Sequence, residues 1–494
     1  MLIIAIGMIF TLLALFHTNI WFDESYSVSL ATHSFSEIWR IDSHDVHPVF
    51  YYQCLHCLYL LVGENIQIYR LFSWACLAMM GIFGYTGIRK DYGEECGLWF
   101  SFFVFFFPVN VVYAGEIRMY MLVSLLILLG IFYCIRLAKG QTSIWNYFRM
   151  MLFFVLAAYT HYYGLLAAAV ANLILLIVLV LHRKEKSWKD FAMWFIVGAL
   201  QIALYIPWIF VFLAQTGNVK TNFWIQWIWP KSLLEILLFQ ISGNLEKEIY
   251  VPVIFAVILE TSMTVYLLVN AYHKKHQHGY ITIFTLGTYF GVIAIATAAG
   301  LAMHRIIIYS RYLLVCTSAL FLYFAYNFAS FGKKMLNAVF CAAIMICSIC
   351  AELSLIHINY DSSNQAPYEY LDENMQEGDA ILVGNYNQDP NSFIAVSKYM
   401  NHPLYYWNEM YWMDESVKAY QAYGTGMRVV YDLKDIKGLS GRVWVIYADD
   451  DHVGHAMNHV YDAALQAFHA TGSGTQYFQT KYKSIEYTIG LITV

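Results

Sequence analysis

The run LAAAVANLILLIVLVLH at residues 166–182 decides the class of fold, because it holds no acid, lysine or arginine. In lipid, backbone N–H and C=O groups find no water, so a segment of this composition satisfies them by forming a helix. Ten further segments are long and largely apolar, and we predict eleven membrane spans in all. They lie near residues 2–20, 66–88, 96–115, 118–136, 148–165, 166–182, 191–213, 249–271, 281–301, 307–328 and 335–356.

The composition of the whole chain agrees with a membrane protein. Of its 494 residues, 60% are apolar and 13% are charged, whereas soluble proteins have roughly 45–50% apolar and about 25% charged residues. A mean hydropathy of +0.51 and 18% aromatic residues exclude a disordered chain. The net charge of −5 gives no reason to expect nucleic acid as a partner.

The charged residues and the cysteines both divide the chain near residue 360. Residues 360–494 hold 17 acids and 8 bases, and all nine cysteines precede them. We therefore predict two domains, a membrane domain over 1–359 and a polar domain over 360–494. In the second domain, strand-like runs at 380–383, 427–431 and 442–448 alternate with helical patterns at 392–400 and 456–470, and 478–494 has an alternating pattern. This order predicts a small α/β domain with a largely parallel sheet.

Lysine and arginine in the short connections predict the orientation of the spans. Alternate connections hold thirteen of these bases, which we assign to the cytoplasm, and the opposite side holds eight. Residues 2–20 lack a basic start and a small-residue cleavage site, so we expect a retained span rather than a cleaved signal peptide. With eleven spans, the long segments 21–65 and 214–248 and the C-terminal domain all lie on the outer face of the cell membrane.

Two apolar stretches on the outer side are too short to cross a bilayer. Residues 49–62 and 231–242 are each interpreted as a helix that lies in the membrane interface. Trp224, Trp227 and Trp229 suit the headgroup level, where an aromatic side chain keeps one edge in water.

Two groups of polar residues in the first outer segment are candidates for chemistry. Asp23 and Glu24 follow the first span directly and could act as a general base or bind a cation; the alternative is a capping pair at a helix start. The sequence His44-Asp45-Val46-His47-Pro48 could contact an acceptor, move a proton or bind a metal, or could simply be a turn. No cofactor is required by these patterns, and a divalent cation is the alternative they leave open.

Basic and aromatic residues next to later spans are candidates for binding an anion. Glu116 and Arg118 do not share a helix face, so Arg118 is available to a phosphate unless it reaches to lipid headgroups. His161, in Thr160-His161-Tyr162-Tyr163-Gly164, is either a ligand contact or a packed interface residue. His304-Arg305 and Ser310-Arg311-Tyr312 open a span. Two arginines at such a depth are costly unless they meet anions, which favours an anionic lipid headgroup or a phosphate as their partner.

Taken in order, these motifs resemble those of the integral-membrane GT-C glycosyltransferases. The resemblance is closest to the protein O-mannosyltransferase-like branch, which includes bacterial lipopolysaccharide-core and lipid A sugar transferases, and it covers about residues 1–330. The matching segments are WFDE (21–24), DVHP (45–48), the YY-x-x-L-H run from Tyr51, Arg70-Leu71-x-Ser73, YAGEIRMY (113–120), THYYG (160–164) and YSRYLLV (309–315). One departure is that Val49 follows Pro48, where relatives often have a second proline.

The resemblance implies a fold, a donor and a set of site residues. The fold would be an α-helical polytopic GT-C membrane protein, and the donor a polyprenyl-phosphate sugar whose acceptor is a lipid, a glycan or a protein. Asp23, or else Glu24, would be the catalytic base. Asp45 and His47 would line the acceptor side. Arg118 and Arg311 would hold the lipid phosphate, supported by Glu116, Tyr120, His161, Arg305 and Tyr312.

The chemistry of these groups predicts transfer with inversion of the anomeric centre. Fixed guanidinium groups stabilise the charge on a departing phosphate, and one carboxylate takes the proton of the acceptor. Direct displacement with a single base inverts the centre, whereas a second, nucleophilic carboxylate would retain the configuration. Two other functions remain as alternatives: a polymerase or ligase of lipid-linked glycans, and a multi-span transporter or flippase.

Overall fold

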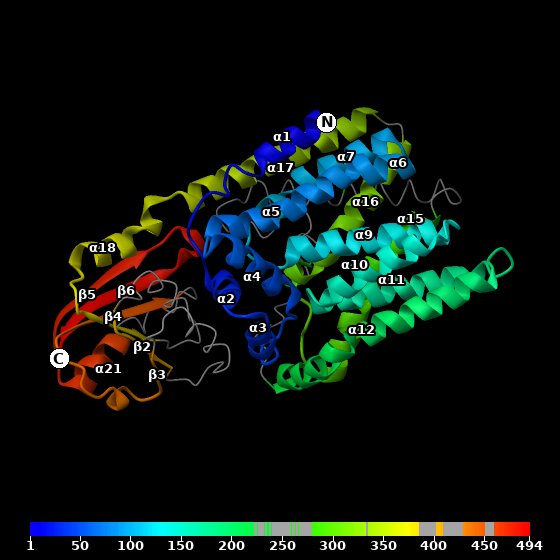
Figure 1. Cartoon of the computed structure of the whole chain (residues 1–494). Helices are drawn as coiled ribbons and strands as arrows, with labels where there is room; N and C mark the ends of the chain where they lie inside the picture. Colours follow the sequence, from blue (N-terminus) through cyan, green and yellow to red (C-terminus); the bar gives the residue numbers. More distant parts are fainter. Residues whose placement is uncertain are drawn as a thin grey trace. The chain divides into compact units, whose positions relative to one another are not determined.

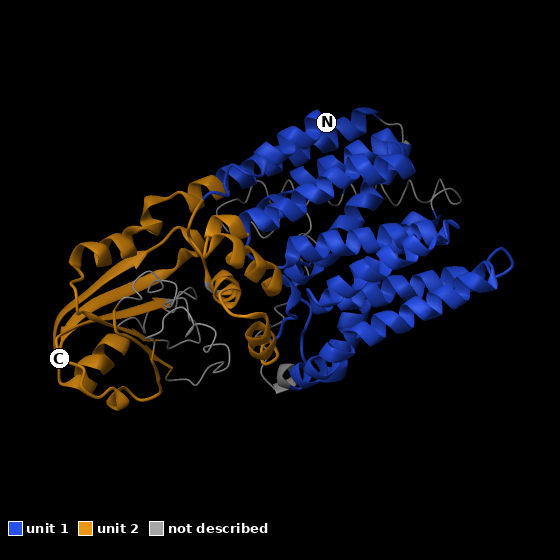
Figure 2. Ribbon diagram, in the orientation of Figure 1, with its two compact units in different colours: residues 1–16, 46–51, 70–354 blue, residues 17–45, 52–69, 355–494 orange. Residues whose placement is uncertain are grey.

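The structure, a computed structural model, describes residues 1–221, 279–331, 334–384, 402–408, 428–449 and 459–494, with eight single residues between 222 and 278. Its elements are labelled in Figure 1. The described chain forms two compact units, shown in two colours in Figure 2. Unit 1 comprises residues 1–16, 46–51 and 70–354, and unit 2 comprises residues 17–45, 52–69 and 355–494. The division predicted at residue 360 stays a prediction.

Helices make up most of the described chain as far as residue 359. The described residues contain seven helical segments that are long and apolar enough to cross a membrane, so the chain is a multi-pass membrane protein. These segments are Ile66–Tyr92, Tyr120–Ala138, Tyr162–Leu181, Trp188–Gly217, Gly279–Met303, Ser310–Ser330 and Lys334–Asn359. The α-helices are α1 (Leu2–Phe10), α2 (Phe22–Ala31), α3 (Phe35–Asp42), α4 (Phe50–Val62), α5 (Ile66–Phe83), α6 (Arg89–Tyr92), α7 (Glu94–Phe106), α8 (Pro108–Tyr113), α9 (Tyr120–Ala138), α10 (Ile144–Ala158), α11 (Tyr162–Leu181), α12 (Trp188–Thr221), α15 (Gly279–Met303), α16 (Leu314–Phe331) and α17 (Lys334–Asn359).

Helix α9 lies at the centre of unit 1. It packs against α10, α11 and α16, and 83% of its apolar stretch is buried, against 17% for α12. Both helices are apolar on all sides, a composition that suits either a protein interior or a lipid environment. The packing separates the two cases: α9 is the core of the bundle, whereas α12 presents side chains such as Phe210 and Leu213 outward.

The first predicted span, 2–20, is wrong in its helical length, because α1 ends at Phe10. Thr11 follows, and its Oγ1 donates to the carbonyl of Gly7 at 2.9 Å. The backbone N–H of Ala14 then donates to the carboxylate of Glu352 at 2.9 Å. A side chain from α17, distant in the sequence, therefore takes over a backbone group that a continued helix would have satisfied itself.

Three other predicted boundaries move for identifiable local reasons. The span 96–115 divides into α7 and α8, because Pro108 pushes Phe107 into an extended conformation with ψ 130°. The junction predicted at 165/166 lies instead at 159–161, where His161 caps α11. The span 307–328 begins with a 3-10 turn, Ser310–Leu313. Residues 49–62 form α4 as expected, whereas the predicted helices 231–242, 249–271 and 392–400 and the tryptophans at 224, 227 and 229 lie outside the described residues.

The C-terminal part of unit 2 is a small α/β domain, as its sequence pattern predicts. Six strands form one sheet in the order β3-β2-β1-β4-β6-β5. The first four strands of that order are mutually parallel, and β6 joins β4 and β5 in antiparallel pairs. The strands are β1 (Ala380–Gly384), β2 (Leu404–Trp407), β3 (Arg428–Val430), β4 (Arg442–Asp449), β5 (Thr471–Gln479) and β6 (Glu486–Thr493).

Helix α21 (His459–Phe468) covers one face of this sheet through Val460, Tyr461 and Ala464. Two strand glycines let it approach closely. A Cβ on Gly384 would meet Val460 at 2.4 Å, and one on Gly490 would meet the Tyr461 ring at the same distance. The alternating run 478–494 was predicted as one stretch; it is the end of β5, a turn and β6, and the strand β2 was not predicted.

Asp379, just before β1, is a buried carboxylate that accepts three hydrogen bonds. Its donors are the Arg442 guanidinium at 3.0 Å, the Trp444 indole at 2.7 Å and the backbone N–H of Gln376 at 2.9 Å. Burial alone would raise the pKa of Asp379, but these donors and the positive charge of Arg442 hold that pKa below its ordinary value. The carboxylate therefore ties β4 to the start of β1.

We expect Asp379→Asn to reduce the free energy of unfolding of this sheet by about 2 kcal/mol at neutral pH, because two side-chain donors lose a charged acceptor. An aspartate whose pKa is lowered by folding adds stability above its unfolded-state pKa and loses it as the pH falls through the folded-state pKa. The difference from wild type should thus shrink below about pH 4. Hydrogen exchange of β1 and β4 in the full chain measures this difference in stability at neutral pH and below about pH 4. A difference of the same size under both conditions would contradict the prediction.

Candidate functional site

The two acids of the first outer segment lie in the first turn of α2. Trp21 is the extended N-cap residue, and its carbonyl accepts the N–H of Ser25 at 2.8 Å. Glu24 is fully buried, whereas Asp23 is partly exposed. A helix N-terminus stabilises negative charge through the helix dipole. The helix dipole therefore acts on both acids, and of the two only Asp23 is partly exposed, with its Oδ2 buried.

Other polar groups of unit 2 surround α2. The hydroxyl of Tyr482 donates to Glu24 Oε2 at 2.8 Å. The hydroxyl of Tyr26 donates to the fully buried Asp42 at 3.4 Å, and the ring of Tyr26 packs edge-on against Tyr52. Helix α2 is thus held at its start by the sheet domain and further along by α3 and α4.

Arg118 lies in the short connection between α8 and α9, which polar contacts hold in place. The buried Arg70 of α5 donates to the carbonyl of Gly115 at 2.8 Å, and the N–H of Arg118 donates to the carbonyl of Glu116 at 2.7 Å. The guanidinium of Arg118 donates to His47 Nε2 at 3.2 Å. Because a guanidinium group can only donate, His47 Nε2 is the acceptor in this contact.

His161 caps α11 and is the centre of a group of rings. Its backbone is extended (φ −159°, ψ 142°), and its Nδ1 accepts the backbone N–H of Tyr163 at 3.0 Å. The other side of the ring faces aromatic neighbours. Ring centroids lie at 5.3 Å for Tyr312, 5.8 Å for Tyr163, 6.0 Å for Tyr120 and 6.1 Å for His47.

Arg311 belongs to the same group. It lies in the 3-10 turn before α16, with its guanidinium 5.2 Å from the Tyr309 ring centre. The Tyr309 ring lies 5.6 Å from that of Tyr312, which in turn contacts His161. We call this set the His161 cluster; its members are His47, Arg118, Tyr120, His161, Tyr163, Tyr309, Arg311 and Tyr312, all of unit 1. Two guanidinium groups among neutral rings form an arrangement suited to an anion such as a phosphate.

The structure thus gathers six of the predicted site residues in one cluster. These are His47, Arg118, Tyr120, His161, Arg311 and Tyr312. Glu116 supports the Arg118 connection through its backbone, and Arg305 is exposed after the left-handed residue His304 that ends α15. Asp23, Glu24 and the buried Asp45 belong to unit 2.

The predicted alternative of a metal at His44-Asp45-Val46-His47 receives no support. Over the described ranges, no three His, Cys, Asp or Glu side chains gather as ligands. His44 contacts the carbonyl of Arg40 at 2.9 Å and the hydroxyl of Ser43 at 3.2 Å, while His47 contacts Arg118. His44 and His47, three positions apart in the sequence, therefore contact different partners.

Four residues of these arrangements were not among the predicted site residues. Arg70 lay in a quoted motif without a role, and Tyr163 and Tyr309 adjoin residues that were named. Their spacing gave no reason to prefer them. Tyr482 lies 458 positions from Glu24 and carries no local signal at all, so only the folded chain could identify it.

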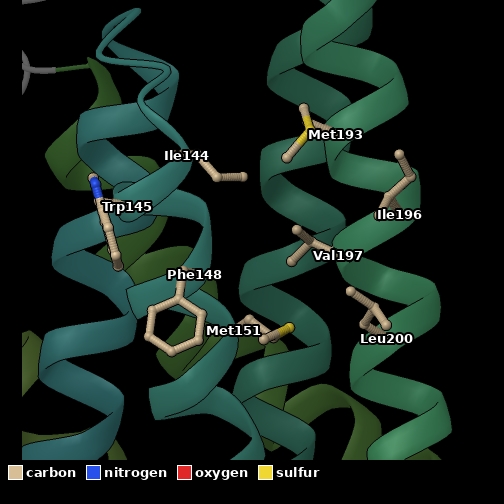
Figure 3. Close-up of a pocket in the computed structure, with 8 residues that line it drawn as sticks. All are labelled: Ile144, Trp145, Phe148, Met151, Met193, Ile196, Val197 and Leu200. Carbon is tan, nitrogen blue, oxygen red and sulfur yellow. The ribbon is translucent and has the colours of Figure 1, made fainter.

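A groove on the side of the bundle lies apart from the cluster. Figure 3 shows its lining side chains, which come from α10 and α12 and are apolar. Its volume is about 230 Å³, and its residues are Ile144, Trp145, Phe148, Met151, Met193, Ile196, Val197 and Leu200. Its lining suits hydrocarbon and offers nothing to a phosphate. Ile144 begins α10, whereas His161 follows the other end of that helix.

These elements define an α-helical polytopic membrane protein with a small C-terminal sheet domain. The crystal structure of ArnT from Cupriavidus metallidurans in the apo state shares this architecture, with a TM-score of 0.62 and 11% identity. The structure of that ArnT bound to undecaprenyl phosphate gives a TM-score of 0.57 and 12% identity. Both comparisons cover 99% of this chain and 97% of ArnT. The chain therefore has the GT-C fold that its motifs predict.

Comparison of the sequence alone adds no relative. No family model matches the chain, and no curated protein matches it.

Two substitutions separate the capping role of His161 from its ring contacts. His161→Ala removes the side chain that accepts the Tyr163 N–H, and we expect the free energy of unfolding to fall by about 1 kcal/mol or more. His161→Asn keeps a capping acceptor, so its loss should be smaller. Thermal unfolding of the purified chain measures both. Equal losses would show that the ring contacts, rather than the cap, determine the start of α11.

Proposed function

We propose that this protein is a glycosyltransferase that moves a sugar from a polyprenyl-phosphate donor to an acceptor on the extracytoplasmic face of the membrane. The observation that carries the proposal is the His161 cluster, which contains two arginines from different helix ends. Arg118 is linked to His161 through the His47 ring, and Arg311 is linked to it through the Tyr309 and Tyr312 rings. The GT-C fold and its likeness to ArnT bound to undecaprenyl phosphate support it.

In this proposal Arg118 and Arg311 hold the phosphate of the lipid donor. When the bond between the anomeric carbon and the phosphate oxygen breaks, negative charge grows on that oxygen. Guanidinium groups already in place stabilise this charge without reorganising. Arg70 keeps the Arg118 connection in position by donating to Gly115 at 2.8 Å, and Tyr309 lies beside Arg311. In the proposed phosphate site, the rings of Tyr120, His161 and Tyr312 support the two arginines. Glu116 and Arg305 are proposed as further residues of this site.

Asp23 is the proposed general base, with Glu24 as its neighbour on α2. Asp23 is partly exposed at a helix N-terminus, where its ionised form is favoured. It would take the proton of the acceptor hydroxyl while the acceptor oxygen bonds to the anomeric carbon and polyprenyl phosphate leaves. One displacement of this kind inverts the anomeric centre. Asp45 is proposed on the acceptor side; His47, proposed there too, also touches Arg118 and so links the acceptor with the donor phosphate.

The two arginines can be tested by donor binding. We expect Arg118→Ala and Arg311→Ala each to weaken binding of undecaprenyl phosphate by about tenfold to a hundredfold, because each removes charge-assisted hydrogen bonds to a phosphate. Titration of the purified protein with the lipid measures this. Arg89→Ala is the matched control, since Arg89 is a surface arginine that pairs with Glu94 at 3.4 Å. If both variants bound the lipid as wild type does, the phosphate assignment would be wrong.

The base can be tested by transfer rather than binding. Asp23→Asn keeps the size of the side chain and removes its basicity, so we expect a loss of at least about a hundredfold in kcat with donor binding unchanged. Transfer from an undecaprenyl-phosphate sugar is followed by mass spectrometry, and NMR of the purified product gives its anomeric configuration. Full activity of Asp23→Asn would exclude Asp23 as the base. A product with the configuration of the donor would exclude direct displacement.

A further inference from the structure

The turn between β5 and β6 carries a side chain to α2. Residues 480–485 form this turn, and its tip bears Tyr482, which is 8% exposed. The Tyr482 hydroxyl donates to the Glu24 carboxylate at 2.8 Å, and Glu24 is fully buried. Both residues belong to unit 2. A fully buried carboxylate is costly unless it accepts hydrogen bonds, so this donor affects both the charge and the orientation of Glu24.

The backbone of the turn is strained in order to reach this position. Lys483 and Ser484 have φ values of 53° and 51°, in the left-handed region that costs a residue with a Cβ about 1 kcal/mol or more. Thr480 stabilises the strained form. Its Oγ1 donates to the carbonyl of Tyr482 at 2.9 Å and accepts the N–H of Ile485 at 3.1 Å.

The segment that follows α17 also holds the turn in place through hydrogen bonds. Tyr482 N–H donates to Asn364 Oδ1 at 2.8 Å, and Lys481 N–H donates to Ser363 Oγ at 3.1 Å. Asn364 is itself buried and donates to the carbonyl of Ile358 at 2.8 Å. The position of the Tyr482 hydroxyl is therefore set by backbone contacts rather than by a mobile loop tip.

The chain just before α2 contacts the same turn. The Lys483 ammonium lies 4.5 Å from the centre of the Trp21 ring, and the His17 ring lies 5.4 Å from that of Tyr482. Asn19 Nδ2 donates to the carbonyl of Asn359 at 2.8 Å. The titratable groups on these elements include Asp23, the neighbour of Glu24 in the sequence, His17 beside Tyr482, and Lys483 beside Trp21. The start of α2 and the residues before it thus contact the turn between β5 and β6 through Glu24, Trp21 and His17.

We infer that Tyr482 is a positioning residue that holds Glu24, and with it the acid pair of α2, in the arrangement that sugar transfer requires. The inference rests on the proposed function. In this inference the C-terminal domain contributes to the reaction site, because its strained turn places the Tyr482 hydroxyl where it donates to the buried Glu24 carboxylate. The role belongs to the hydroxyl, because the ring alone would fill the space without donating to Glu24.

Tyr482→Phe removes the hydroxyl and keeps the ring. We expect kcat to fall about tenfold at neutral pH while undecaprenyl phosphate binding and the KM for the acceptor change little. The low-pH limb of the kcat profile should move upward by about one pH unit, because a carboxylate that has lost an O–H donor is protonated more readily. In a Glu24→Gln background this shift should disappear, since an amide does not titrate in this range.

A matched tyrosine controls for simple loss of stability. Tyr461 is 7% exposed, and its hydroxyl accepts the Gly474 N–H at 3.0 Å and donates to the Leu491 carbonyl at 3.3 Å, within the same domain. Tyr461→Phe should lower the melting temperature and leave the pH profile unchanged. If Tyr482→Phe behaved like Tyr461→Phe, Tyr482 would have a structural role only, and the inference would be overturned.

The same assay distinguishes failure of the inference from failure of the proposed function. If wild type transfers sugar and Tyr482→Phe keeps the wild-type kcat and pH profile, the positioning role is wrong while the function stands. If wild type transfers no sugar from undecaprenyl-phosphate donors and does not bind undecaprenyl phosphate, the function is wrong and the inference falls with it. A shift that persists in the Glu24→Gln background would show that Tyr482 acts on another group.

Discussion

The requirement that every backbone polar group find a partner, which lipid enforces strictly, governs this structure. It makes long helices from most of the first 359 residues, and it makes each interruption of a helix depend on side chains that replace the missing bonds. After the end of α1, the Glu352 carboxylate accepts the N–H of Ala14. Between α8 and α9, the Arg70 guanidinium donates to the carbonyl of Gly115. At the start of α11, His161 Nδ1 accepts the N–H of Tyr163. The connections between these helices are therefore fixed by specific side-chain hydrogen bonds.

The candidate chemistry lies at those breaks. His161 sits between α10 and α11, Arg118 between α8 and α9, and Arg311 before α16, so the residues of the His161 cluster are all helix-end residues of unit 1. Helix interiors satisfy their own backbone and present apolar side chains, which leaves polar side chains to the ends. The groove between α10 and α12 illustrates the contrast: apart from Ile144 and Trp145 at the start of α10, its lining comes from helix interiors, and it is apolar.

The sequence was informative where the signal is local. Apolar length predicted the helices, and short strand-like runs predicted β1, β3 and β4. Pro108 accounts for the division of α7 from α8, a stretch that we predicted as one span. Local patterns failed where distant groups decide. The short helix α1 ends where Glu352 and Thr11 take over its backbone bonds, and β2 is too short and too aromatic to be recognised before its neighbours β1 and β3 are known.

By itself, the sequence determined that this is a multi-pass helical membrane protein with an α/β domain at its end, because apolar length and periodicity act through neighbouring residues. It also singled out scarce polar residues, such as Asp23, Arg118, His161 and Arg311, because charge is rare in such a chain. Only the tertiary structure decided which of them meet. Arg118 donates to His47, the His161 ring packs against that of Tyr312, and Tyr482 donates to Glu24, 458 positions away in the sequence. These contacts depend on distances in space, which the order of residues does not contain.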